Sequence, residues 1–195
     1  KKKKNHFLDR DNELGLSKIG YYFIGGIMKS VDSFSAWFNP SLNSYDRLNA
    51  RTTKSGSTYS PTAVTYSGNN RTHMIRIPDA GRIEFRPADG AVNPYLLQAG
   101  LIAMGLDGIK NKRSPGKRID INMYSQGHKL KRVKKLPQSL TESLNKFKAS
   151  EVVKKSIGSK VVSQYVKLKK REIAEHNKVS DGNKKDWERK NIIDC

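Results

Sequence analysis

The stretch Arg82-Ile-Glu-Phe-Arg86 is the most informative part of the sequence. Charged and apolar residues alternate along it, and successive side chains of a β-strand point to opposite faces. Arg82, Glu84 and Arg86 would therefore share one face, with Ile83 and Phe85 on the other. The alternation predicts a strand over residues 81–86 with one charged face and one buried, apolar face. From this stretch alone, a surface strand with paired charges is an equally good interpretation.

A second short run of this kind lies just upstream, at residues 72–77. The intervening Pro78-Asp-Ala-Gly81 has the composition of a turn, so two strands joined by a turn are predicted. A tight hairpin would pair Arg76 near Ile83 and place Arg76 on the face opposite Glu84. A bulge, or strands that do not pair directly, would resolve this conflict, and the sequence does not choose between them.

Arginine is concentrated around these two runs, where lysine is rare. Arg71 and Arg76 belong to or precede the first run, and Arg47 lies upstream in Asn43-Ser-Tyr-Asp-Arg-Leu48. Arginine grips carboxylate and phosphate groups through two parallel hydrogen bonds. An isolated glutamate among arginines suits a divalent cation that bridges phosphates. The residues therefore suggest a site for an anionic substrate together with a nucleotide–metal complex.

Helices are predicted from the spacing of apolar residues at 14–38, 93–108, 139–147 and 150–177. Ser17 is a plausible N-cap of the first helix, and Asn93 followed by Pro94 has the composition of a helix start. Gly25 and Gly26 indicate either a weakened first helix or close packing against a neighbour. Residues 49–61 form a long polar loop, which is usually a functional or mobile feature in a compact domain.

The composition excludes several classes of protein. The chain has 195 residues and a single cysteine, Cys195, so it is not a disulfide scaffold. Its most apolar run, Ile19–Met28, is about half of the roughly 20 residues that a membrane-spanning helix needs. The net charge of +20 suggests a polyanionic partner such as nucleic acid. However, 24 of the 38 lysine and arginine residues lie in residues 110–195, where stacking aromatics are scarce, and solvated helix faces are the favoured interpretation.

Five motifs in this order and spacing resemble the catalytic domain of glutamine synthetases: Asn43–Leu48, Asn70–Pro78, Arg82–Arg86, Asn93–Leu96 and Gly105–Lys112. The resemblance extends from about Asn5 to the C-terminus. It is closest to bacterial type III glutamate–ammonia ligases, a group similar to γ-glutamylmethylamide synthetases. The fold that it implies is α+β: part of an antiparallel sheet carrying the arginine and glutamate residues, with surrounding helices and a helical C-terminal extension. Residues 1–109 would be the core of this domain and residues 110–195 its basic, mostly helical part.

The resemblance also implies roles for single residues. Arg47 and Arg86 would hold the substrate glutamate. Arg71 and Arg76 would bind the transferring phosphoryl group and the nucleotide phosphates, with Arg71 as the catalytic residue. Arg82 would support the nucleotide, and Glu84 would be a ligand of the metal between the phosphates. The resemblance further implies ATP with Mg²⁺ or Mn²⁺ as cofactors, and glutamate with ammonia or methylamine as substrates. It also implies a ring-shaped homo-oligomer in the cytoplasm, with neither membrane nor nucleic acid as a partner.

Two departures from the family pattern bear on activity. The family's mobile loop usually carries a glutamate that closes the site and helps deprotonate ammonium, but Tyr59 stands at that position and no carboxylate occurs between Asp46 and Asp79. A neutral loop weakens the case for binding ammonium and leaves room for a larger or less charged amine such as methylamine. The favoured interpretation is that a carboxylate from outside this chain does the work of the missing glutamate. The family's other metal ligands lie upstream of the first motif, and His6 is no substitute. Residues 1–195 alone are therefore expected to be inactive.

Two further residues are candidates for a functional role. His73 could be a ligand or a base, but an alternating strand makes a packed or surface histidine the better interpretation. Tyr124 lies where some bacterial glutamine synthetases carry an adenylylated tyrosine, although the flanking Met123 and Ser125 differ from that pattern.

Overall fold

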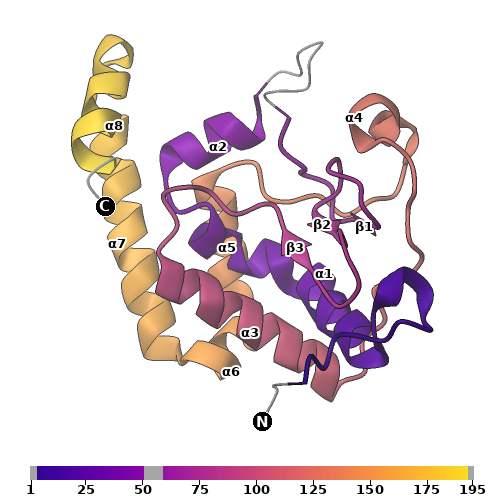
Figure 1. The fold of residues 1–195 in the computed structure, drawn as a ribbon. Coiled ribbons are helices and arrows are strands. Elements are labelled where there is room, and N and C mark those ends of the chain that lie inside the picture. The colour runs from indigo at the N-terminus through magenta and orange to yellow at the C-terminus, as the bar shows by residue number, and fades with distance from the viewer. Residues whose placement is uncertain (1–3, 51–58, 193–195) are drawn as a thin grey trace.

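The computed structural model describes residues 4–50 and 59–192 (Figure 1). Helix α1 (Lys18–Phe38) runs through the middle of the molecule, with α3 (Pro94–Lys110) and α5 (Leu140–Ala149) packed against it. Helices α6 (Glu151–Ile157), α7 (Ser159–Asn177) and α8 (Lys184–Ile192) follow along one side. The short elements are η1 (Glu13–Gly15), α2 (Leu42–Leu48), α4 (Met123–Gln126), η2 (Gly127–Lys129) and η3 (Asp181–Asn183).

The sheet is small and mixed. Its order is β1 (Tyr66–Ser67), β2 (Ile75–Arg76), β3 (Glu84–Phe85), with β1 parallel and β3 antiparallel to the central strand. The predicted α+β class and the antiparallel pair are confirmed, whereas the parallel strand β1 was not predicted. The two strands pair directly, and Arg76 lies opposite Glu84, one residue away from the register of a tight hairpin; this resolves the conflict that the sequence left open. Directly opposed residues have side chains on the same face, so Arg76 and Glu84 meet.

The first predicted helix forms for the expected reasons. The Ser17 hydroxyl accepts a hydrogen bond from the Gly20 amide, which caps the first turn of α1. Gly25 and Gly26 are sites of close packing: a Cβ on Gly26 would lie 2.0 Å from the Met104 carbonyl oxygen on α3, and one on Gly25 would lie 2.0 Å from the Arg113 carbonyl oxygen. The two glycines therefore let α1 and its neighbours approach at backbone distance.

The other predicted helices needed correction at their ends. Helix α3 continues past Asp107 to Lys110, where the amide of Asn111 bonds the Asp107 carbonyl oxygen. The helix predicted over 150–177 is two helices, because Gly158 has φ +91° and ends α6. The short helices α2 and α8 were not predicted.

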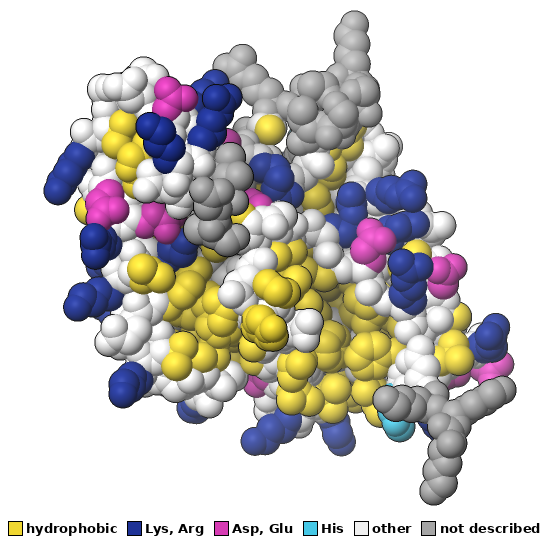
Figure 2. All heavy atoms as spheres, turned by 60° about the vertical axis from the view of Figure 1, so that its left-hand side comes forward, with side chains coloured by type: hydrophobic (Ala, Val, Ile, Leu, Met, Phe, Trp, Pro, Cys, Tyr) yellow, Lys and Arg dark blue, Asp and Glu magenta, His cyan; other side chains and the backbone are white. Residues whose placement is uncertain are grey.

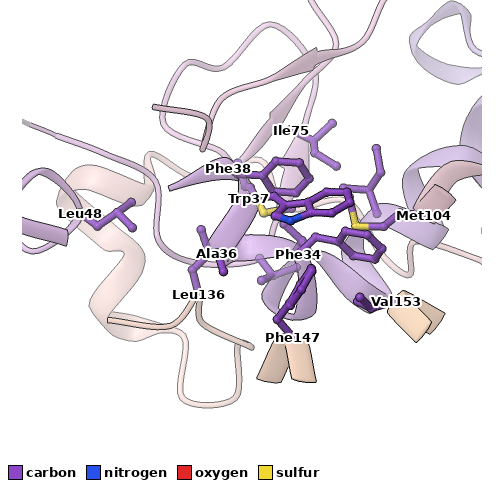
Figure 3. Packing of buried hydrophobic residues seen from close by; sticks show 14 of the residues in the cluster. Phe34, Ala36, Trp37, Phe38, Leu48, Ile75, Met104, Leu136, Phe147 and Val153 are labelled. Carbon is purple, nitrogen blue, oxygen red and sulfur yellow. The ribbon is translucent and has the colours of Figure 1, made fainter. Parts of the chain in front are cut away.

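The core is built around the C-terminal half of α1 (Figure 3). Phe34, Trp37 and Phe38 are fully buried, and the ring of Phe147 on α5 contacts the first two. Phe38 also contacts Phe85 on β3 with a centroid distance of 5.0 Å. The helical core is thus joined directly to the strand that carries Glu84.

Apolar side chains also gather on one face of the molecule, with lysine and arginine side chains around them (Figure 2). Large exposed apolar residues include Tyr95, Ile102 and Leu106 on α3, and Val161 and Leu168 on α7. Within the described residues, no helix is both long and apolar enough to cross a membrane.

Candidate functional site

Glu84 lies between two arginine side chains. Arg76 Nη1 donates to Glu84 Oε2 at 2.8 Å, and Arg86 Nε lies 3.2 Å from Glu84 Oε1. The first contact follows from the opposed positions on β2 and β3, and the second from side chains two residues apart sharing a strand face. The predicted shared face of Glu84 and Arg86 is therefore present, and Arg76 joins it.

Arg86 is a largely buried cation beside Glu84. Its side chain is 24% exposed, and its Nη1 is buried with no hydrogen-bond partner among the described residues. Burial lowers the pKa of Arg86; the charge of Glu84 opposes that shift, and the positive charges of Arg76 and Arg71 add to it. A buried N–H donor in positive surroundings is costly unless an acceptor meets it. These residues therefore fit an anionic group such as a carboxylate or phosphate.

Arg71 is exposed and has no hydrogen bond or ion pair within the part of the chain that the structure describes. Its two neighbours are fixed. The Asn70 side chain accepts from the Thr72 amide at 3.0 Å and donates to the Ile121 carbonyl oxygen at 3.1 Å. The amide of Met123 donates to the Thr72 hydroxyl at 2.9 Å. The backbone around Arg71 is thus fixed by hydrogen bonds, while its guanidinium, close to Arg86, has no partner among the described residues.

Arg47 is held by three hydrogen bonds. Its Nη1 donates to the Ser60 hydroxyl, and its Nη2 donates to Asn39 Oδ1 and to the Pro87 carbonyl oxygen, at 2.8–2.9 Å. Its Nε is buried without a hydrogen bond, and lies 3.9 Å from Asp89 Oδ2. Arg47 therefore connects α2 to the segments before β1 and after β3.

Arg82 lies apart from the other arginines. Its side chain is 65% exposed, and Nη1 is 3.4 Å from Asp79 Oδ2 on the turn before β3. The strand begins only at Glu84, so the predicted alternation does not extend back to Arg82. The structure thus brings together Arg71, Arg76, Glu84 and Arg86, here called the arginine cluster, with Arg47 held nearby through Pro87.

Several contacts around the arginine cluster were not predicted from the sequence. Asn69 Oδ1 accepts from Arg76 Nε and Nη2, which fixes the guanidinium plane. Tyr59 donates its hydroxyl to the Thr72 carbonyl oxygen at 2.9 Å, and its ring meets the ring of Tyr124 edge-on. The two consecutive asparagines before Arg71 could have indicated the hydrogen bonds to Arg76. The contact between the two tyrosine rings joins residues 65 positions apart, so no local sequence pattern could have indicated it.

The described residues do not form a metal site on their own. They contain no group of three or more histidine, cysteine, aspartate or glutamate side chains placed to hold a metal ion. Glu84 is the one carboxylate of the arginine cluster, and arginines engage both of its oxygens. Mg²⁺ normally takes six oxygen ligands and Mn²⁺ prefers similar ones. Glu84 would therefore supply only part of a site.

His73 is a packed histidine, in agreement with the favoured interpretation. It is fully buried, with Nδ1 3.0 Å from the Thr65 hydroxyl and Nε2 2.9 Å from the Ile121 carbonyl oxygen. A carbonyl oxygen only accepts, so Nε2 carries the proton of the neutral ring. Burial lowers the pKa of His73, against the smaller opposing effects of the Ile121 carbonyl and Asp120.

This lowered pKa predicts a loss of stability in acid. The unfolded chain takes up the proton more readily than the folded one, so the stabilising contribution is complete above the unfolded pKa of about 6.5 and is lost as the pH falls through the folded pKa. Urea unfolding at pH 7.5 and 5.5 should show a larger loss for the wild type than for His73→Gln. The exposed His128 gives the matched control, since His128→Gln should keep the wild-type difference. Equal losses in wild type and His73→Gln would contradict the prediction.

Comparison with known proteins gives consistent results. Residues 1–191 match the model of the glutamine synthetase catalytic domain. The chain is 51% identical over 165 residues to a glutamine synthetase of Rhizobium leguminosarum bv. phaseoli, covering 85% of the chain and 38% of that protein. It is 37% identical to a glutamate–methylamine ligase of Methyloversatilis universalis, covering 92% and 41%. A solved GmaS/ADP complex superimposes with a TM-score of 0.82 at 44% identity, covering 97% and 43%.

The chain spans about two fifths of the length of the curated relatives that it matches. The family model nevertheless covers almost every residue of this chain, and the predicted motifs fall within the matched region. The chain therefore belongs to the glutamine synthetase family, within the catalytic domain that defines it.

Proposed function

We propose that this chain forms the phosphate- and glutamate-binding part of an ATP-dependent ligase that makes a γ-glutamyl amide. The relatives named as glutamine synthetases and as a glutamate–methylamine ligase support this activity. The observation that carries the proposal is the buried, unpartnered Nη1 of Arg86 in surroundings made positive by Arg71 and Arg76. Such a donor suits an incoming carboxylate or phosphoryl oxygen.

The arginine cluster would act on the two anions of the first step. In that step a γ-carboxylate oxygen of glutamate bonds to the terminal phosphorus of ATP, and the bond from that phosphorus to the bridging oxygen of ADP breaks. Arg86 and Arg47 would hold the glutamate, while Arg71 and Arg76 would neutralise charge on the transferring phosphoryl group. Arg82, at the exposed turn, would support the nucleotide.

The second step uses the same positive charges. The amine nitrogen bonds to the γ-carbonyl carbon, and phosphate leaves with the electron pair of the broken C–O bond. The amine must lose a proton to a base. The described arginine cluster has no free carboxylate for this role, because arginines contact both oxygens of Glu84. Glu84 would contribute one ligand to a Mg²⁺ or Mn²⁺ ion, with the rest of the site coming from outside the described residues.

Ammonia is the amine in the proposed reaction, and methylamine is the second candidate. Tyr59, at the position where the family pattern usually has a glutamate, leaves room for methylamine, and the likeness to a glutamate–methylamine ligase supports this second candidate. Residues 1–109 and 110–195 would form one domain, in keeping with the packing of α5 on α1. The complete protein would be a homo-oligomeric ring in the cytoplasm, where ATP and glutamate are available.

The test is amide formation by the full-length protein. Phosphate release should require ATP, glutamate and an amine together, and comparing ammonia with methylamine identifies the amine. Glu84→Ala should lower kcat at least about 100-fold, because it removes the proposed metal ligand and leaves Arg76 and Arg86 without their counter-charge. Glu175→Ala is the matched control, since that carboxylate pairs with Arg171 on the outside of α7. Full turnover by Glu84→Ala would refute the metal assignment.

A further inference from the structure

One carboxylate on helix α8 joins three helices. Glu188 is 13% exposed, and its Oε1 lies 3.1 Å from His176 Nε2 on α7. The side-chain nitrogen of Asn43 on α2 lies 2.7 Å from Glu188 Oε2 and 3.1 Å from Oε1, in the amide orientation that donates to the carboxylate. The His176 ring also meets the Trp187 ring, with centroids 5.3 Å apart. Glu188 therefore connects α8 to α7 and to α2, beside which α8 stands at the upper left of Figure 1.

The burial of Glu188 distinguishes it from the other acidic residue of α8. Asp186 is 70% exposed and pairs with Arg189 on the same helix at 3.9 Å. Such a surface pair contributes little to stability. A buried carboxylate is costly unless hydrogen-bond donors meet it, so the donors on Asn43 and His176 decide where the carboxylate can lie. Glu188 is therefore a connection between helices rather than a solvated charge.

Packing leaves a gap between α2 and α8. A cavity of about 260 Å³ lies between the start of α2 and the end of α8, with Pro40, Ser41 and Asn191 among its lining residues. Helix α2 has seven residues and α8 has nine, and isolated helices of this length are unstable. The position of one helix relative to the other therefore depends on side-chain bonds. Loss of the Glu188 bonds would leave α2 room to shift.

Helix α2 carries Arg47 one turn beyond Asn43. The two residues are four positions apart, so their side chains emerge on the same side of the helix. The helix starts with a capping box, in which the Ser41 hydroxyl accepts from the Ser44 amide at 3.2 Å. Arg47 Nη2 donates to Asn39 Oδ1, just before the helix, at 2.8 Å. This segment is therefore held as one unit, and a shift of Asn43 would move Arg47 with it.

We propose that Glu188 is a positioning residue, which holds α2 in place through Asn43 and so sets the position of Arg47 for the substrate carboxylate. The inference rests on the proposed function, in which Arg47 holds glutamate, and adds a residue outside the arginine cluster. The side chains that Glu188 bonds among the described residues are Asn43 and His176, neither of which belongs to the cluster. Its loss should therefore weaken glutamate binding more than the chemical step, which raises KM and leaves kcat almost unchanged.

The experiment measures kcat and the KM for glutamate in the full-length protein. Glu188→Ala and Asn43→Ala should each raise the KM about 10-fold, the cost of one hydrogen bond to a charged group, while kcat stays within about 3-fold. The double variant should have the same KM as either single variant, because both remove the same interaction. Asp186→Ala is the matched control, since this exposed acid on the same helix should leave the KM unchanged.

A rescue variant separates positioning from a general loss of structure. Asn43→Asp alone places two carboxylates together and should raise the KM at least as much as Asn43→Ala. Asn43→Asp combined with Glu188→Gln exchanges the amide and the carboxylate and restores a charge-assisted hydrogen bond, so the KM should return to within about 3-fold of wild type. Urea unfolding of each variant shows whether the protein measured is folded.

The outcomes separate this inference from the proposed function. A KM that rises in both single alanine variants and recovers in the exchanged pair supports positioning by Glu188. If the wild type forms the amide and folded Glu188→Ala keeps its KM within about 2-fold, or loses kcat instead, the inference is wrong and the ligase activity stands. Effects that add in the double alanine variant also overturn it. If the wild type forms no amide, the proposed function fails and the inference fails with it.

Discussion

Replacement of Arg86 by alanine is expected to lower kcat/KM for glutamate about 1000-fold in the full-length protein. The guanidinium is mostly buried, its Nη1 has no partner among the described residues, and Glu84 orients it through Nε. A preorganised cation needs little rearrangement when negative charge develops, and removal of one such group costs a factor of this size. Steady-state kinetics with glutamate, ATP and each amine measure the effect.

Two further variants make the Arg86 prediction specific. Arg86→Lys keeps the charge but loses the planar fork, so it should recover only a small part of the activity. Arg171→Ala removes an arginine from the surface of α7, where it pairs with Glu175, and should leave activity unchanged. Urea unfolding of each variant separates lost activity from lost folding. Activity of folded Arg86→Ala within about 10-fold of wild type would contradict a direct role in substrate binding.

The sequence predicted the pieces of this site better than their arrangement. Alternation placed Glu84 and Arg86 on one face because that relation depends only on neighbouring residues of one strand. The pairing of Arg76 with Glu84 depends on the connection between the strands. Gly81 there adopts φ +73°, and its amide and carbonyl oxygen bond to Gly15 and Asn5. A contact with a segment more than 60 residues away sets the register, and local turn composition could not reveal it.

The helices show the same division. Long elements with a clear apolar spacing and a cap, such as α1 after Ser17, were predictable from local sequence. Helix α2 has seven residues, and its long-range contacts include the bond from the Tyr45 hydroxyl to Ser143 at 2.7 Å. Isolated helices of this length are unstable, so tertiary contacts decide whether they form. Strand β1, with two residues, left no periodic pattern.

The burial of the arginine cluster could not be predicted from the composition of the chain. The chain's net charge of +20 points to its lysine-rich C-terminal part, whereas the arginine cluster contains only a few of the positive charges. What distinguishes Arg86 from those lysines is that its charge is enclosed beside Glu84 and lacks a partner for Nη1. The side chain of Arg86 is enclosed because of tertiary packing, including the contact of Phe85 with Phe38. The amino-acid composition alone cannot predict such packing.

The second large effect is expected at the contact between α1 and α3, where Gly26→Ala should destabilise the chain by about 3 kcal/mol. The added Cβ would lie 2.0 Å from the Met104 carbonyl oxygen and 2.7 Å from the Gly108 backbone. These atoms belong to a helix backbone and cannot turn aside as a flexible side chain could, so the helices must separate. Gly108→Ala should act similarly, since its Cβ would lie 2.1 Å from the Tyr22 carbonyl oxygen.

Urea unfolding of the 195-residue chain measures this cost, with Gly90→Ala as the control because a Cβ there meets nothing within 4 Å. An unchanged midpoint for Gly26→Ala would mean that the helices do not pack at backbone distance. The separation should also reach the site, because α3 packs on Phe38 through Gly100, and Phe38 packs on Phe85 beside Glu84 and Arg86. In the full-length protein, Gly26→Ala should therefore lower kcat/KM as well, although Gly26 lies more than ten residues from the arginine cluster in the sequence. Gly90→Ala should not.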